Sequence, residues 1–111
     1  MLARALTLLA LGLASLATPA CTSPTLPLPP PSLSELRLDN GQVTVEGTAA
    51  PGSMVFVRNR DLGEGVIKDA QEPDGYFLAV VPGSEGDLIV VWSQLDDEQS
   101  PAIERIVPPA R

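Results

Sequence analysis

The sequence contains no histidine, one cysteine and few aromatic residues, and each shortage excludes a class of chemistry. In this chain of 111 residues, aromatic side chains make up 4% of the total. Without histidine, neither a Ser-His-Asp triad nor a Cys-His pair can form within one chain. A single cysteine allows neither a zinc cluster nor an internal disulfide. We therefore predict a protein that is not an enzyme and that binds no metal or cofactor.

Positive charge is also scarce, which bears on the possible partners. The chain has seven Lys and Arg residues and fourteen Asp and Glu residues, giving a formal net charge of -7. Binding to the phosphates of nucleic acid requires clustered basic side chains. Nucleic acid is therefore excluded as an expected partner. The length allows one folded domain at most.

The first 20 residues have the pattern of an export signal. Arg4 precedes an unbroken apolar run from Ala5 to Ala17, and small residues follow this run. A charged start, an apolar core and a small-residue cleavage site are typical of a signal peptide. The run is shorter than the roughly 20 apolar residues that span a bilayer. We expect residues 1–20 to be removed in the mature protein.

The end of this leader resembles a bacterial lipobox, the motif whose cysteine is acylated on sulfur and becomes the mature N-terminus. In Thr18-Pro19-Ala20-Cys21, Ala20 matches the small residue before the cysteine, whereas Thr18 replaces the leucine that lipoboxes favour. The resemblance implies a lipoprotein whose Cys21 carries palmitate-type chains and anchors it to a membrane of the bacterial cell envelope. Thr22 in place of aspartate slightly favours the outer membrane. The alternative is an ordinary cleavage site and a soluble secreted protein.

Residues 21–32 combine the candidate lipidated cysteine with a proline-rich tether. The segment from Thr22 to Ser32 reads TSPTLPLPPPS and carries no charge. Proline fixes φ and removes amide donors, so this segment is expected to be an extended spacer that rises about 3.1 Å per residue. It would hold the folded part roughly 30 Å from the lipid. A ligand for a polyproline-binding domain is the alternative.

Residues 33–108 have the pattern of an all-β domain, followed by a short tail at 109–111. Short alternating apolar segments are separated by turn residues such as Asn40-Gly41 and Pro51-Gly52, and no segment has the spacing of an amphipathic helix. Seven strands are predicted: Glu35–Leu38, Gln42–Thr48, Met54–Asn59, Gly65–Asp69, Tyr76–Val81, Leu88–Leu95 and Ala102–Val107.

Three segments of this domain resemble bacterial immunoglobulin-like domains and carboxypeptidase regulatory-like domains. They are Val45–Val57 (VEGTAAPGSMVFV), Asp74–Phe77 (DGYF) and Gly86–Val91 (GDLIVV). The resemblance implies a small antiparallel immunoglobulin-like β-sandwich of about seven strands, without peptidase activity. The segment Leu95–Ser100 departs from the immunoglobulin-like pattern, so the register of the last strand is the least certain.

The alternation within the strands predicts which side chains face inward. The expected core is Val43, Val45, Val55, Val57, Phe77, Ala79, Val81, Ile89, Val91 and Ile103. Large apolar residues also occupy outward positions, although a solvated sheet face normally carries polar side chains. These residues form a possible interaction surface: Phe56, Tyr76, Leu78, Val80, Leu88, Val90 and Trp92. Either the tether or the tail covers them, or they bind a partner.

Other candidate sites have ordinary explanations. Acidic residues at Glu72, Asp74, Asp87 and Asp96–Glu98 have no EF-hand spacing, so a solvated acidic loop is favoured over calcium. The serines have no histidine to activate them. Two functions remain: an anchored module with a structural or protein-binding role, or an accessory carbohydrate- or protein-binding subunit of a larger envelope complex.

Overall fold

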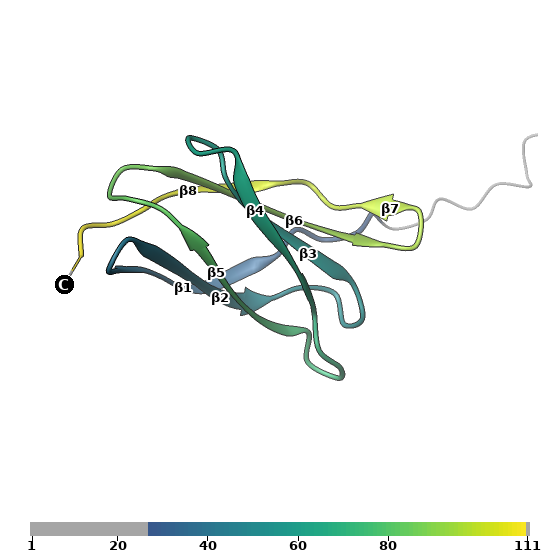
Figure 1. The fold of residues 1–111 in the computed structure, drawn as a ribbon. Helices are drawn as coiled ribbons and strands as arrows, with labels where there is room; N and C mark the ends of the chain where they lie inside the picture. The colour runs from purple at the N-terminus through teal and green to yellow at the C-terminus, as the bar shows by residue number, and fades with distance from the viewer. Residues whose placement is uncertain (1–26, 111) are drawn as a thin grey trace, which may run out of the picture.

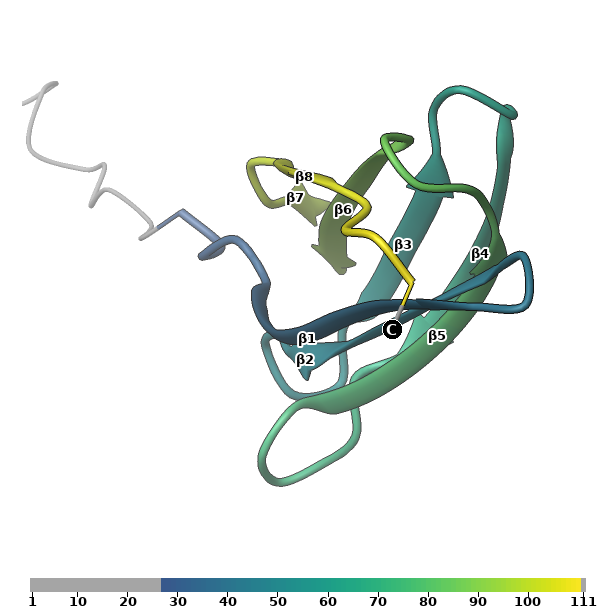
Figure 2. The same cartoon turned by 90° about the vertical axis from the view of Figure 1, so that its left-hand side faces the viewer.

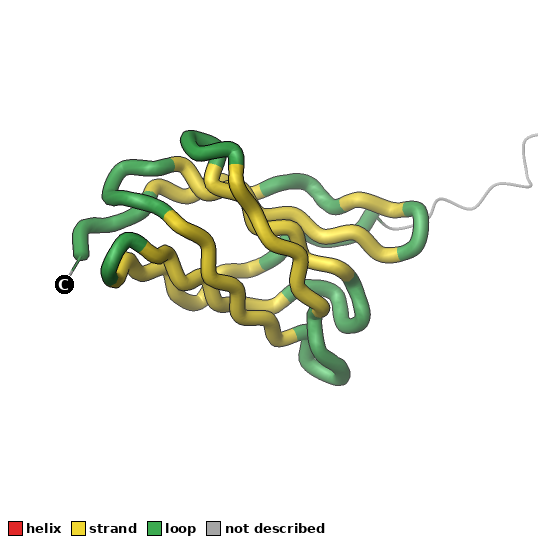
Figure 3. Tube along the Cα trace, viewed as in Figure 1, coloured by secondary structure: helices red, strands yellow, loops and turns green. Residues whose placement is uncertain are grey.

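The computed structural model describes residues 27–110, and these form strands and loops without a helix (Figures 1 and 3). The predicted signal peptide, Cys21 and the first part of the tether lie outside the described residues. The strands are β1 (Ser32–Asp39), β2 (Gln42–Thr48), β3 (Met54–Asn59), β4 (Glu64–Asp69), β5 (Tyr76–Pro82), β6 (Leu88–Leu95), β7 (Glu98–Gln99) and β8 (Ile103–Ile106).

The strands form two antiparallel sheets that pack face to face (Figure 2). One sheet has the order β1-β2-β5, and the other has the order β4-β3-β6, with both β7 and β8 paired to β6. The predicted fold class, a small antiparallel β-sandwich, is confirmed.

Tight turns set the registers of the hairpins. Asn40 and Gly41 have φ values of 52° and 76°, so both central residues of the β1–β2 turn lie in the left-handed region, as a type I′ turn requires. Gly52 has a φ of 81° after Pro51, as expected at the third position of a type II turn. The bounds of β2, β3 and β6 are those predicted from the sequence.

The core lies between the sheets and consists mainly of valines. Alternation along the strands directs these side chains inward, where they lose nearly all exposure to solvent. The buried apolar residues are Val43, Val45, Val55, Val57, Ala70, Phe77, Ala79, Val81, Ile89, Val91 and Val107. The predicted Ile103 is only partly buried and packs against this cluster. Val107 lies beyond β8 but continues its ladder, because its amide donates to the carbonyl of Asp87 at 2.9 Å.

The last predicted strand, Ala102–Val107, is wrong in its extent. Two short strands, β7 and β8, follow the same edge of β6, with Gln99 opposite Gln94 and Ile103 opposite Val91. From Gln99 to Ile103 the edge strand advances by four residues, while β6 advances by three from Gln94 to Val91. The segment that contains Pro101 therefore has one extra residue. Proline has no amide to donate to a ladder, so the strand is interrupted there. The Ser100 hydroxyl accepts the Ser93 amide at 2.9 Å and bridges the gap.

The described ends of the chain lie at opposite ends of the sandwich (Figure 1). Pro27–Pro29 lie beside the turn at Leu95–Glu98, and Pro31 is buried. At the other end, Pro108 and Pro109 lie beside β1. β1 itself begins at Ser32, earlier than the predicted Glu35, because this strand continues its pairing with β2 past an irregularity between Leu33 and Glu35.

Candidate interaction surfaces

The predicted interaction surface is divided between the two outer faces of the sandwich. β5 and β6 belong to different sheets, so their outward side chains point in opposite directions. Phe56, Leu88, Val90 and Trp92 lie on the outer face of the five-stranded sheet, whereas Tyr76, Leu78 and Val80 lie on the outer face of the three-stranded sheet. The structure therefore does not bring these residues together in one patch.

We call the outer side of the five-stranded sheet the aromatic face, comprising Met54, Phe56, Ile67, Leu88, Val90, Trp92 and Ile106. At its centre, Phe56 on β3 lies directly opposite Trp92 on β6. Their rings are stacked, with centroids 5.1 Å apart and planes inclined by 3°. Ile67 lies opposite Phe56 on β4, so a row of three large apolar side chains crosses three adjacent strands. Such cross-strand aromatic pairs stabilise a sheet and offer a large apolar area to a partner.

The described ends of the chain leave the aromatic face open. Ile67 retains 58% of its exposure and Ile106 retains 61%. The described end of the tether lies against the β6–β7 turn, and Pro108 and Pro109 lie beside β1. The expectation that the tether or the tail covers this face is therefore wrong for residues 27–32 and 108–110, while Leu26 lies outside the described residues.

Charged side chains border the aromatic stack on one side. Trp92 lines a shallow hollow of about 370 Å³ together with Arg58, Arg60 and Glu104. Arg60 Nη1 lies 3.1 Å from Glu104 Oε2 in an exposed ion pair. Arg58 forms no ion pair with any described residue. This hollow is thus locally positive on a protein of net negative charge, which favours an anionic group on any partner.

A second, smaller hollow of about 140 Å³ lies on the Phe56 side of the stack. Gly65 on β4 contributes to its lining and lies opposite Arg58. A Cβ at Gly65 would come within 2.7 Å of the Val57 carbonyl oxygen and 3.2 Å of the Arg58 Cα. Glycine is therefore needed here for β4 to approach β3 closely.

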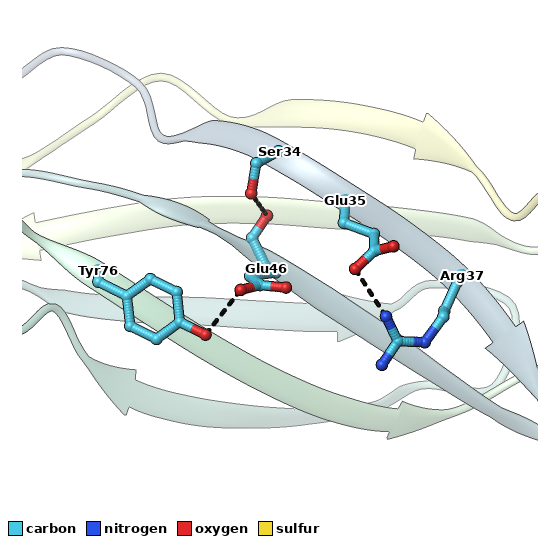
Figure 4. Close-up of polar contacts among 5 residues, drawn as sticks. All are labelled: Ser34, Glu35, Arg37, Glu46 and Tyr76. Carbon is cyan, nitrogen blue, oxygen red and sulfur yellow. Dashed lines mark hydrogen bonds and ion pairs between the residues drawn. The ribbon is translucent and has the colours of Figure 1, made fainter.

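The outer face of the three-stranded sheet carries a polar network instead (Figure 4). The Tyr76 hydroxyl donates to Glu46 Oε2 at 2.8 Å, and Ser34 Oγ donates to the Glu46 carbonyl at 3.1 Å. Arg37 Nη1 lies 2.6 Å from Glu35 Oε2. The hydrogen bond to the Glu46 carboxylate raises the pKa of Tyr76, and desolvation and the negative charge of Glu46 act in the same direction.

A buried polar residue that the sequence analysis missed connects the two sheets. Asn59 is completely buried, and its Nδ2 donates to the Pro82 carbonyl at 3.0 Å and to Asp87 Oδ2 at 2.9 Å. Its Oδ1 accepts the amides of Asp61 and Leu62. The bond from Asn59 and the Ser84 amide lower the pKa of Asp87. Asn59 shares the inward parity of Val55 and Val57, and a polar residue at such a position is the signal that could have revealed it.

The acidic residues of the loops do not converge. Within residues 27–110, no group of three or more Asp, Glu, Cys or His side chains is arranged to hold a metal ion. The same part of the chain has no helix with the length and apolar character needed to cross a membrane.

Comparison of the sequence with protein-family models and with curated proteins found no match.

Proposed function

We propose that this chain is a non-enzymatic lipoprotein of the bacterial cell envelope that presents a protein-binding β-sandwich. The single observation that carries the binding role is the open aromatic face, where the Phe56–Trp92 stack lies among exposed aliphatic side chains. Exposed apolar patches bordered by polar residues are typical of interaction sites, and tryptophan and arginine contribute strongly to interface energies.

The membrane anchor in this proposal is supported by the sequence alone. An apolar leader, a lipobox-like Thr18–Cys21 and a proline-rich segment precede the sandwich. Because each buried methylene contributes about 0.8 kcal/mol, two or three acyl chains on Cys21 would hold the protein on a membrane while the sandwich remains in water. The outer membrane is slightly favoured, and a secreted protein with an unmodified cysteine is the alternative.

The partner that fits the aromatic face is an envelope protein with apolar side chains and a carboxylate. Phe56, Ile67 and Trp92 supply the apolar contact. Arg58 and Arg60 lie at its border, and Glu104 is the acidic residue that lines the hollow with them. A carboxylate from the partner can therefore pair with Arg58 in a charge-assisted hydrogen bond.

Carbohydrate binding is the second candidate, and the composition of the larger hollow favours it. Trp92 lines this hollow with Arg58, Gln99 and Glu104, which offer both donors and acceptors to sugar hydroxyls. However, Phe56 and Trp92 stack on each other rather than forming a flat platform. One face of each ring is thereby used within the protein, which reduces the aromatic area available to a sugar.

The binding role is tested with Trp92→Ala and Arg58→Ala, each compared with Leu78→Ala on the opposite face. After mild cross-linking in native membranes, we expect the chain to be joined to a different protein with wild type and with Leu78→Ala, but not with Trp92→Ala, and less with Arg58→Ala. Circular dichroism confirms that each variant is folded. Cross-linking to this different protein that is unchanged in folded Trp92→Ala would contradict the proposal. Quenching of the fluorescence of the single tryptophan by soluble envelope oligosaccharides would favour carbohydrate binding instead.

The anchor is tested by the intact mass of the protein purified from its native membranes. We expect a chain that begins at Cys21 with the added mass of two or three acyl chains. The Cys21→Ser variant should lose this mass and move to the soluble fraction. A wild-type chain without added mass would contradict the anchor but leave the binding role of the aromatic face untouched.

A further inference from the structure

The edge of β1 differs from the other sheet edges of the described chain. Proteins block edge strands with charges that point inward, with prolines or with cover from neighbouring segments. β4 carries Lys68 at an inward-facing position opposite Val55 and packs against β5, the far edge of the other sheet. The β7–β8 edge is interrupted by Pro101. From Glu35 to Asp39, β1 carries neither proline nor an inward charge.

A groove runs along this edge. It has a volume of about 560 Å³ and is lined by residues Ser34–Asp39 together with Pro108 and Pro109. Leu36 and Leu38 point toward the core but remain only partly buried. No backbone hydrogen bond joins the described tail to β1. The outward amides and carbonyls of β1 are thus available for pairing with another strand, which would also cover the two leucines.

We propose that this edge binds a second copy of the chain, with the two β1 strands antiparallel and Leu36 opposite Leu36 of the second copy. The pairing joins the two three-stranded sheets into one continuous sheet of six strands. Its two-fold axis lies perpendicular to the sheet, so each copy presents the same residues to the other. This inference goes beyond the proposed function and does not depend on the anchor or on the aromatic face.

Charge and the bounds of the regular strand select this register from the few that the symmetry allows. A two-fold axis perpendicular to the sheet keeps Leu36 and Leu38 of both copies on the core side. Residues that lie opposite each other must point to the same face of the sheet. The axis therefore passes through a residue that lies opposite the same residue of the second copy. An axis at Glu35 or at Arg37 places like charges directly opposite each other, which is unfavourable. An axis at Leu38 places Arg37 opposite Asp39, but its pairing ends there because Asn40 lies in the turn with a φ of 52°. An axis at Leu36 lies within the regular part of β1, between the irregularity at Leu33–Glu35 and the turn, and places Glu35 opposite Arg37 of the second copy twice.

The polar network on the same face supplies a second argument (Figure 4). Glu35 lies directly opposite Glu46 in the β1–β2 pair, although two carboxylates in this position repel each other. Arg37 is the cation that pairs with Glu35, at 2.6 Å, while Tyr76 donates to Glu46. In the proposed dimer, Arg37 of the second copy reaches Glu35 from its free side. The neighbouring carboxylates of Glu35 and Glu46 are then accompanied by two arginines, Arg37 of the same copy and Arg37 of the second copy.

The test exchanges these charges in the full chain carrying Cys21→Ser, so that acyl chains cannot bring two copies into one micelle. We expect sedimentation equilibrium to show a dimer for this parent chain. Glu35→Arg and Arg37→Glu each replace two attractive cross-strand pairs by two repulsive ones, so the dissociation constant should rise about tenfold or more. Arg105→Glu on β8, which changes the charge by the same amount as Arg37→Glu, should leave the dimer intact.

Mixing the two variants distinguishes this register from a general effect of charge. In the mixed dimer, both arginines of the Glu35→Arg chain oppose both glutamates of the Arg37→Glu chain, so equimolar mixing should restore association. The double variant with Glu35→Arg and Arg37→Glu should also dimerise like the parent. A monomeric parent chain, or a mixture that stays monomeric, would overturn the proposal. So would a dimer that survives both changes and dissociates with Trp92→Ala, because its contact would then be the aromatic face.

Discussion

The two outer faces of the sandwich differ in how their side chains are held. On the five-stranded sheet, Phe56 and Trp92 stack on each other and leave apolar surface open. On the three-stranded sheet, Tyr76 and Glu46 are joined by a hydrogen bond, and Glu35 and Arg37 form an ion pair. Both faces cover the same valine core. A strand with apolar residues on both sides can therefore have one side that packs the core and another that stays open to solvent.

If the outer faces were part of the core, neighbouring residues of β5 would contribute equally to stability. Phe77 is fully buried, whereas Leu78 retains 41% of its exposure. Phe77→Ala should lower the free energy of unfolding by about 3–5 kcal/mol, because it removes a large side chain from between the sheets. Leu78→Ala should cost about 0.5 kcal/mol. Urea unfolding measures both, and equal losses would show that the outer face of β5 is packed.

The next largest effect is expected where the two sheets are joined. Asn59 on β3 bonds to Pro82 at the end of β5 and to Asp87 in the loop before β6. Asn59→Ala should lower the free energy of unfolding by about 2 kcal/mol, because buried polar partners lose their hydrogen bonds. Arg58→Ala, at the neighbouring outward position, serves as the control. If thermal unfolding shows the same loss for both variants, the buried network is not what holds the sheets together.

Much of this architecture could be predicted from alternation and turn residues. Alternation in Gln42–Thr48 and the apolar segment Leu88–Leu95 predict strands with correct bounds, and Asn40-Gly41 predicts the hairpin between the first two strands. Alternation assigns each residue to a face of its own strand, but it does not say which strands share a sheet. For that reason the sequence predicts one surface for Tyr76 and Trp92, although they lie on opposite sides of the molecule.

Hydrogen bonds between residues far apart in the sequence cannot be predicted from these patterns, for a similar reason. Asn59 and Asp87 are 28 residues apart, and their bond exists because β3 and β6 pair in one sheet. Likewise, the bond from the Ser93 amide to the Ser100 hydroxyl, beside the break at Pro101, exists only because these residues meet across the ladder. Such contacts depend on strand pairing, which a pattern within a single strand does not contain.

The aromatic stack itself can be measured by a double-mutant cycle. If Phe56 and Trp92 support each other as their geometry indicates, the combined variant Phe56→Ala with Trp92→Ala should be more stable than the sum of the single losses predicts. The coupling should be about 1 kcal/mol, as for other stacked aromatic pairs. Phe56→Ala combined with Leu78→Ala, on opposite faces, should be additive. A coupling near zero for the stacked pair would mean that each ring is held by the sheet alone.

The smallest expected effect is on the outer face of the three-stranded sheet, and it is measured as the pH at which Tyr76 ionises. The hydrogen bond to Glu46 raises the pKa of Tyr76 above its ordinary value of 10.0, because it favours the neutral phenol. Its contribution to stability is fully present below pH 10 and is lost as the pH rises through the higher pKa of the folded protein. Since Tyr76 is the single tyrosine of the chain, its ionisation can be followed by ultraviolet absorbance. Glu46→Gln should bring the midpoint back toward 10.0, whereas Phe56→Leu on the opposite face should leave it raised. A wild-type midpoint at or below 10.0 would show that Tyr76 does not donate to Glu46 in solution, and the outer face of the three-stranded sheet would then lose the polar network that distinguishes it from the aromatic face.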